Sequence, residues 1–227
     1  MGVTLPRWVW VGAGLLACVA GMVNVVGYLG FEHQAVTHLT GTTTLLGEAV
    51  ARRDLRAISH LGGVALAFMA GAAISGMIVQ DSTLRLGRRY GVALVLESVL
   101  LFAAIPLFKQ GQLAGALLAA MACGLQNAMA TTYSGAVIRT SHLSGMFTDL
   151  GIGLGHALRG MPLQTRRLLL CALIISGFFT GAVLGGLLFL RFGYGALTVP
   201  ATITGSIGLG YAGYRQLQLR QERTGAT

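Results

Sequence analysis

The chain has 227 residues, of which 54% are hydrophobic and only 10% charged, whereas an average soluble domain carries about 25% charged residues. A soluble core cannot bury that proportion of apolar side chains, so the composition indicates a polytopic helical membrane protein. The net charge of +9 does not indicate nucleic-acid binding, because the arginines lie in short clusters between apolar runs, as the flanks of membrane spans do.

Six apolar stretches approach the length of about 20 residues that crosses a bilayer. The first stretch is too long for a signal peptide and lacks a cleavage site, so we expect it to remain as a span. The whole chain is expected to form one transmembrane domain. In chain order the six stretches are roughly 8–30, 57–80, 90–108, 112–138, 168–190 and 196–214, followed by a cytoplasmic tail at 215–227.

The second half of the sequence repeats features of the first. GMVN at residues 21–24 matches GLQN at 124–127, and THLTG at 37–41 matches SHLSG at 141–145. Later, the small residues of FMAGAAISG at 68–76 match those of FFTGAVLGG at 178–186, and we expect both rows to pack tightly against other helices. The order of the matches is kept, which predicts two repeat units, 7–109 and 110–214.

Two short segments, 40–51 and 144–158, decide how the units are oriented. If they are half-helices, each unit crosses the membrane three times and the units are inverted; if they cross fully, each unit crosses four times and the units are parallel. The arginine distribution favours cytoplasmic termini equally in both arrangements. We favour half-helices because Thr42, Thr43, Thr44 and Glu48 in one segment and Asp149 in the other make weak spans. The predicted fold is thus an all-α bundle of about six spans plus two short, re-entrant or broken helices.

The scarce polar residues of the apolar regions gather in the repeated motifs. Intramembrane polar groups usually face a protein interior or a water path, so we predict a substrate-binding or gating site where the two units meet, as in transporters with interrupted helices. The glycines of the two motifs are expected to break the chain, with Thr40, Thr42 or Ser144 capping the helices that follow. The predicted site residues are Asn24, Gln126 and Asn127 from the first spans, His38, Thr40, Thr42, Thr43 and Glu48 from the first short segment, and His142, Ser144, Thr148 and Asp149 from the second.

Glu97 stands alone in the third span and is either a proton carrier or the partner of an arginine in another span. Glu48 and the histidines have no spacing typical of metal ligands, and no phosphate loop, nucleophile elbow or dinucleotide fingerprint is present. We therefore expect no metal, no cofactor and no catalytic residues.

At these motifs the chain resembles the YoaK-like family of small bacterial membrane proteins, whose function is unknown. The resemblance covers about residues 10–210 and includes Asn24 in a glycine-rich first span, TGT at 40–42, GLQNA at 124–128 and HLSG at 142–145. It implies a bacterial inner-membrane protein of about six spans and supplies no substrate. The family more often has Asp at the position of Asn24 and TGN at 40–42, so a proton-carrying Asp in relatives would imply a different mechanism here.

The sequence is compatible with three functions. The first is a small transporter or channel for a small solute or ion, with its site between the repeated motifs. The second is a membrane scaffold or assembly protein, in which the polar motifs only hold helices together. An intramembrane enzyme is the third. The bilayer is the expected partner, nucleic acid is not, and a homodimer is a candidate assembly because each half is small.

Overall fold

The computed structural model of the chain describes residues 7–30, 36–79, 88–133 and 139–224. These residues are almost entirely helical and contain no strand, which confirms the predicted all-α class for this part of the chain. The helices are α1 (Arg7–Gly30), α2 (Leu39–Arg52), α3 (Leu55–Val79), α4 (Arg88–Lys109), α5 (Leu113–Tyr133), α6 (Leu143–Leu158), α7 (Thr165–Phe192) and α8 (Thr198–Thr224), with a short 3-10 helix, η1 (Gly193–Leu197), before α8.

Five helical stretches in the described part of the chain are long and apolar enough to cross a membrane. They are Val9–Gly30, Leu55–Val79, Arg89–Lys109, Leu113–Thr132 and Thr165–Gly213. The fifth contains α7, η1 and much of α8, where the sequence predicts two separate spans. The stretch is continuous because η1 directly follows α7 and α8 directly follows η1. The bundle is therefore compatible with a multi-pass membrane protein, as expected.

The two short segments form helices α2 and α6. They have 14 and 16 residues and are about 21 and 24 Å long at a rise of ~1.5 Å per residue, less than the ~30 Å of bilayer hydrocarbon. Each helix begins directly after its motif histidine, His38 or His142, and continues through the glycine three residues later. The prediction that these glycines break the chain is wrong.

The N-caps of α2 and α6 are the two histidines, and neither histidine makes a side-chain capping bond. The prediction that Thr40, Thr42 or Ser144 caps these helices is therefore also wrong. Thr42 lies inside the helix, and its Oγ1 donates a hydrogen bond back to the carbonyl oxygen of His38 at 3.2 Å.

Glycine lets the long helices of the two halves touch backbone to backbone. A Cβ built on Gly71 of α3 would overlap the carbonyl oxygen of Met121 on α5, and one on Gly181 of α7 would overlap that of Cys18 on α1. The small-residue rows thus pack tightly at these two positions, as predicted. The neighbouring Gly76 is open, with nothing within 4 Å of a built Cβ.

The fourth helix of each half, α4 or α8, packs against the other. A Cβ built on Gly91 would lie 2.8 Å from the carbonyl oxygen of Gly208, and one on Gly208 would lie 2.8 Å from the carbonyl oxygen of Gly91. Further along, Ser98 Oγ donates a 2.7 Å hydrogen bond to the carbonyl oxygen of Ala201. Because residue numbers rise along α4 as they fall along α8, the two helices are antiparallel.

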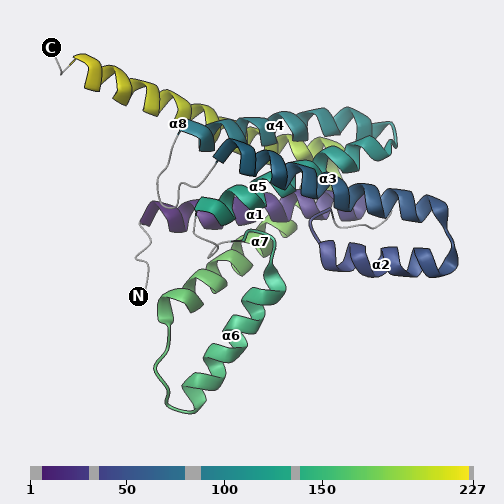
Figure 1. Cartoon of the computed structure of the whole chain (residues 1–227), viewed down its shortest axis with the longest axis horizontal. Coiled ribbons are helices and arrows are strands. Elements are labelled where there is room, and N and C mark those ends of the chain that lie inside the picture. The colour runs from purple at the N-terminus through teal and green to yellow at the C-terminus, as the bar shows by residue number, and fades with distance from the viewer. Residues whose placement is uncertain (1–6, 31–35, 80–87, 134–138, 225–227) are drawn as a thin grey trace.

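Two helical hairpins extend from the bundle (Figure 1). In one, α2 lies beside α3; in the other, α6 lies beside the first part of α7 and leans away from the remaining helices. Asp54 closes the first hairpin, since its Oδ1 accepts hydrogen bonds from the backbone N–H groups of Arg56 and Ala57 at 3.1 and 3.0 Å, a helix N-cap geometry. The short helices are therefore attached mainly through their own hairpins.

Candidate functional site

The amides in the first helix of each half hold the chain that leads into the short helix. Asn24 Oδ1 accepts hydrogen bonds from the backbone N–H of Thr37 at 3.1 Å and from its Oγ1 at 2.7 Å. In the other half, Gln126 Oε1 accepts a longer bond, 3.4 Å, from Thr140 Oγ1. Sequence reasoning did not include either threonine in the site, although Thr37 lies one residue before His38 and Thr140 two residues before His142.

Gln126 also joins α5 to α1, because its Nε2 donates a 3.2 Å hydrogen bond to the carbonyl oxygen of Leu16. Its neighbour Asn127 differs: the side-chain Oδ1 is buried and has no hydrogen-bond partner among the described residues. The predicted amide pair thus contains one group that ties two helices together and one whose acceptor is unused.

His38 and His142 are exposed at the beginnings of α2 and α6. Each imidazole lies against the glycine of its own motif. A Cβ on Gly41 would be 2.9 Å from His38 Nδ1, and a Cβ on Gly145 would be 2.5 Å from His142 Cδ2. The glycine of the repeated motif therefore makes room for the histidine ring rather than breaking the helix.

The hydroxyls of the short helices bond mostly within their own helix. Thr43 Oγ1 donates to the carbonyl oxygen of Leu39 at 2.8 Å, and Thr148 Oγ1 donates to that of Ser144 at 2.9 Å. The side chains of Thr40 and Ser144 are exposed. Self-bonded hydroxyls of this kind are compatible with a helix surface that faces lipid or protein.

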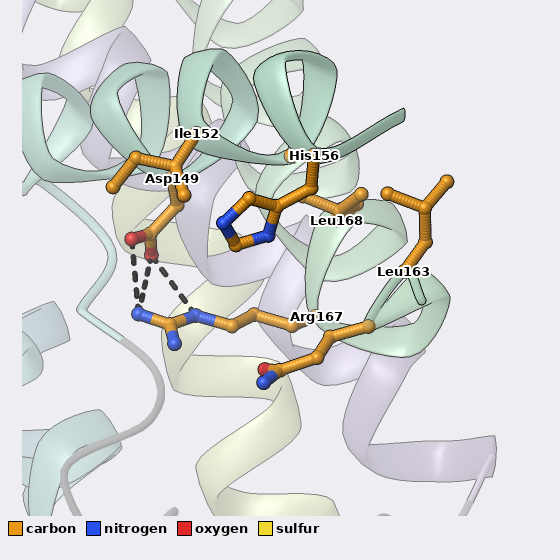
Figure 2. A pocket seen from close by; sticks show the side chains of 8 residues that line it. Asp149, Ile152, His156, Leu163, Arg167 and Leu168 are labelled. Carbon is orange, nitrogen blue, oxygen red and sulfur yellow. Dashed lines mark hydrogen bonds and ion pairs between the residues drawn. The ribbon is translucent and has the colours of Figure 1, made fainter. Parts of the chain in front are cut away.

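The two carboxylates of the short helices each have an arginine partner. Glu48 pairs with Arg52, one turn later on α2, at 2.8 Å, and both side chains are largely exposed. Asp149 of α6 accepts hydrogen bonds from Arg167 of α7, from Nη2 at 2.9 and 3.0 Å and from Nε at 3.2 Å (Figure 2). Because α2 and α6 belong to separate hairpins (Figure 1), the structure does not bring Glu48 and Asp149 together.

Glu97 is the most deeply buried carboxyl group in the described part of the chain. It lies near the middle of α4 and is 1% exposed, and its Oε2 has no hydrogen-bond partner among the described residues. The next residue, Ser98, faces α8, since its Oγ bonds to the carbonyl oxygen of Ala201. A buried carboxyl without a full set of partners is costly to keep, which marks this position as a functional candidate.

Among the described residues, no group of three or more His, Cys, Asp or Glu side chains has the arrangement needed to hold a metal ion.

Comparison with known proteins places the chain in a family without assigning it an activity. No curated protein and no solved structure matches the sequence. A family model described as "Protein of unknown function (DUF1275)" matches residues 12–210, in agreement with the resemblance to an uncharacterised family of membrane proteins. The match covers most of the chain, which therefore belongs to the DUF1275 family of proteins of unknown function.

Proposed function

We propose that the protein is a small membrane transporter or channel for a small solute or ion, built from two inverted repeats around a buried polar site. The observation that carries the proposal is that helices of one half pack against helices of the other half: α1 packs on α7, and α5 packs on α3. Inverted repeats with interrupted helices and a site near the bilayer midplane are a recurrent architecture of secondary transporters.

This packing between the halves is reciprocal at matching sequence positions. A Cβ on Gly21 of α1 would lie 2.9 Å from the backbone nitrogen of Ala182 on α7, and it would also overlap the carbonyl oxygen of Phe178. The matching residue of the second half, Gly124 on α5, would overlap the carbonyl oxygen of Phe68 on α3. Since these glycines and phenylalanines belong to the repeated sequence motifs, the contacts support a two-fold relation between the halves.

The direction of the helices supports inverted rather than parallel units. Close approaches rise together along α3 and α5, from Gly63 with Leu117 to Gly71 with Leu125, so these helices run the same way. Figure 1 shows α3 returning toward the side on which α1 begins. Therefore α5 opposes α1, its counterpart in the first half.

The same reversal supports a re-entrant role for α2. If α2 crossed the bilayer completely between them, α1 and α3 would run in the same direction. They run in opposite directions, and α2 is about 21 Å long at ~1.5 Å per residue. The opposite directions of α1 and α3 and the short length of α2 favour three crossings per unit and six in total. The stretch Thr165–Gly213 then forms two of the spans, and both termini lie in the cytoplasm. The expected location is the bacterial inner membrane.

The best candidates for the transport site are the buried groups with unused hydrogen-bonding capacity. Glu97 on α4 and Asn127 on α5 have this property, and α4 and α5 pack against each other. Asn24 and Gln126 would position the entrances to α2 and α6 through their bonds to threonine. The exposed histidines at those entrances, His38 and His142, would act in gating.

We assign proton transfer to Glu97. An isolated carboxylate is very costly in an apolar interior, so the buried group is stable when protonated. Access to water from one side at a time would allow it to release and take up the proton. An intramembrane ionisable residue of this kind typically marks a proton or ion pathway.

Proton flux into liposomes tests the proposal. Purified protein is reconstituted into liposomes that contain a pH-sensitive dye. A pH gradient is then imposed across the liposome membrane, and a panel of small ions and metabolites is added outside, one at a time. We expect flux above that of empty liposomes for the wild type, and loss of this flux for Glu97→Gln. Glu48→Gln is the matched control, because it makes the same chemical change in an exposed carboxyl that is paired with Arg52.

The transporter proposal would be contradicted if liposomes with the wild-type protein showed the same proton flux as empty liposomes under every gradient. Equal flux through Glu97→Gln and the wild type would contradict the role of Glu97.

A membrane scaffold is the second candidate, and the self-bonded hydroxyls of α2 and α6 favour it. For this function the protein would need no solute path, and its glycine contacts would serve only packing. A stable, well-folded protein without flux, recovered from membranes with a constant partner protein, would support this alternative.

A further inference from the structure

A small pocket lies between α6 and the beginning of α7, at the end of the second hairpin (Figure 2). Its volume is about 120 Å³. The polar part of its lining comes from Asp149, His156, Gln164 and Arg167, and Ile152 and Leu163 contribute to the apolar part. Figure 2 shows Asp149 and His156 pointing from α6 toward Arg167.

We propose that this pocket binds the phosphate group of an acidic phospholipid. The inference is independent of the transport proposal, since it uses none of the buried groups assigned to the transport site. It rests on the local charge, the free donors of the pocket and its position at the end of an apolar helix.

The charge around the pocket favours an anion. Asp149 is the only acidic residue between Glu97 and Glu222 in the sequence. The turn and the first residues of α7 carry Arg159, Arg166 and Arg167, so a positive excess remains after Asp149 has paired with one of them. All three arginine side chains are exposed, so an approaching headgroup can reach them.

The ion pair leaves donors free and fixes their direction. Arg167 uses Nε and Nη2 on the carboxylate of Asp149, and its Nη1 makes no hydrogen bond to a described residue. A guanidinium group has five N–H donors in a rigid fork, so a carboxylate on one edge and a phosphate on another are compatible. The amide of Gln164 and the imidazole of His156 supply further donors at the same pocket.

The surroundings suit a lipid better than a soluble phosphate compound. The membrane-length stretch that contains α7 begins at Thr165, so the pocket lies at one end of an apolar segment, where headgroups are found. Leu158 and Leu169 are close in sequence to lining residues of the pocket and are 81% and 56% exposed, which provides apolar surface for acyl chains. Basic pockets between membrane helices are known binding sites for acidic headgroups.

Binding is measured on the full-length protein in detergent with three probes: short-chain phosphatidylglycerol, short-chain phosphatidylcholine and inorganic phosphate. Affinity is read from the change in thermal unfolding and from microscale thermophoresis. We expect the wild type to bind phosphatidylglycerol at least about tenfold more tightly than the other two probes, the effect of one or two charge-assisted hydrogen bonds.

Two variants and a control locate the site. Arg167→Gln should lose about tenfold in affinity for phosphatidylglycerol, whereas Arg53→Gln, which removes an exposed arginine from the turn of the other hairpin, should bind normally. Asp149→Asn should bind phosphatidylglycerol more tightly, because it removes a negative charge that lies on the other edge of the same guanidinium group. This second variant keeps the test decisive if Arg167→Gln does not fold.

Three results would overturn the proposal. Equal affinity for phosphatidylcholine would mean that the protein does not recognise the charge. Equal affinity for inorganic phosphate would assign the pocket to a soluble anion instead of a lipid. Unchanged or weaker binding of phosphatidylglycerol by Asp149→Asn would mean that the lipid phosphate does not share Arg167 with Asp149.

Discussion

Replacing Gly71 with alanine should separate α3 from α5. The added Cβ would lie 2.8 Å from the carbonyl carbon and closer still to the carbonyl oxygen of Met121, and 3.0 Å from the backbone nitrogen of Leu125. Comfortable non-bonded contact begins near ~3.5 Å, and backbone atoms cannot turn aside as a side chain can. Overpacking a well-packed core by one methyl group costs about 1–3 kcal/mol, and we expect the upper part of that range because the obstacle is main chain.

The assay is reversible unfolding of the purified protein in mixed micelles of a mild detergent and SDS, followed by helix content. Gly76→Ala, on the same helix, is the matched control, since nothing lies within 4 Å of its Cβ. Helix α7 supplies a second pair. Gly181→Ala should destabilise like Gly71→Ala because its Cβ would overlap the carbonyl oxygen of Cys18, whereas Gly186→Ala meets only Val25 at 3.8 Å.

The control substitutions should be neutral or stabilising, because alanine favours helix by up to about 1 kcal/mol over glycine. If Gly71→Ala unfolds at the same SDS fraction as Gly76→Ala, the close backbone contact between α3 and α5 does not exist as described. A large effect at Gly71 with none at Gly181 would contradict the reciprocal packing of the halves.

Two other bonds give predictions of the same kind. Asn24→Leu should lower the free energy of unfolding by about 1 kcal/mol, because Thr37 loses its hydrogen-bond acceptor. Asn24→Asp should retain the wild-type free energy of unfolding, since a carboxylate accepts both bonds. Equal stability of all three proteins in SDS unfolding would refute this role of Asn24. Tyr194→Phe should cost about 1 kcal/mol by removing the hydroxyl that donates to the carbonyl oxygen of Gly30, while the ring stacking on Phe108 at 4.7 Å is retained. A thermal unfolding temperature unchanged by Tyr194→Phe would show that this hydroxyl bond does not secure η1.

The positions of the helices could be predicted from the sequence because membrane spans are set mainly by local hydropathy. The first predicted span, 8–30, became α1 (Arg7–Gly30), and the short segment 144–158 became α6 (Leu143–Leu158). The role of the glycines in the two motifs was predicted wrongly. There the glycines were interpreted as chain breaks, whereas their small size accommodates the ring of His38 or His142.

The pairing of helices could not be predicted, because it depends on contacts between residues far apart in the sequence. Gly71 and Gly76 belong to the same small-residue row, yet only Gly71 meets another backbone. Nothing in the row itself distinguishes them. The partner of Asp149 was missed for the same reason, since Arg167 lies across a turn on the next helix.

The predicted site residues are distributed more widely than the sequence motifs indicated. The amides and Glu97 lie toward the interior, whereas the carboxylates of Glu48 and Asp149 are paired with arginines on two separate hairpins. Sequence spacing placed the polar residues of the two motifs at corresponding depths in the two predicted units, but it does not indicate toward which neighbour a side chain turns. Glu97, outside the motifs, has the strongest burial of the predicted carboxyl groups.

The orientation of the two hairpin turns tests the inverted repeat most directly. Single cysteines are introduced by Arg53→Cys and Arg159→Cys in a background without Cys18, Cys123 and Cys171, and labelled with a membrane-impermeant maleimide in vesicles of known sidedness. Inverted units place residue 53 outside the cell and residue 159 in the cytoplasm, so the two cysteines should label from opposite sides. Labelling of both from the same side would contradict the inverted repeat and the transport proposal built on it.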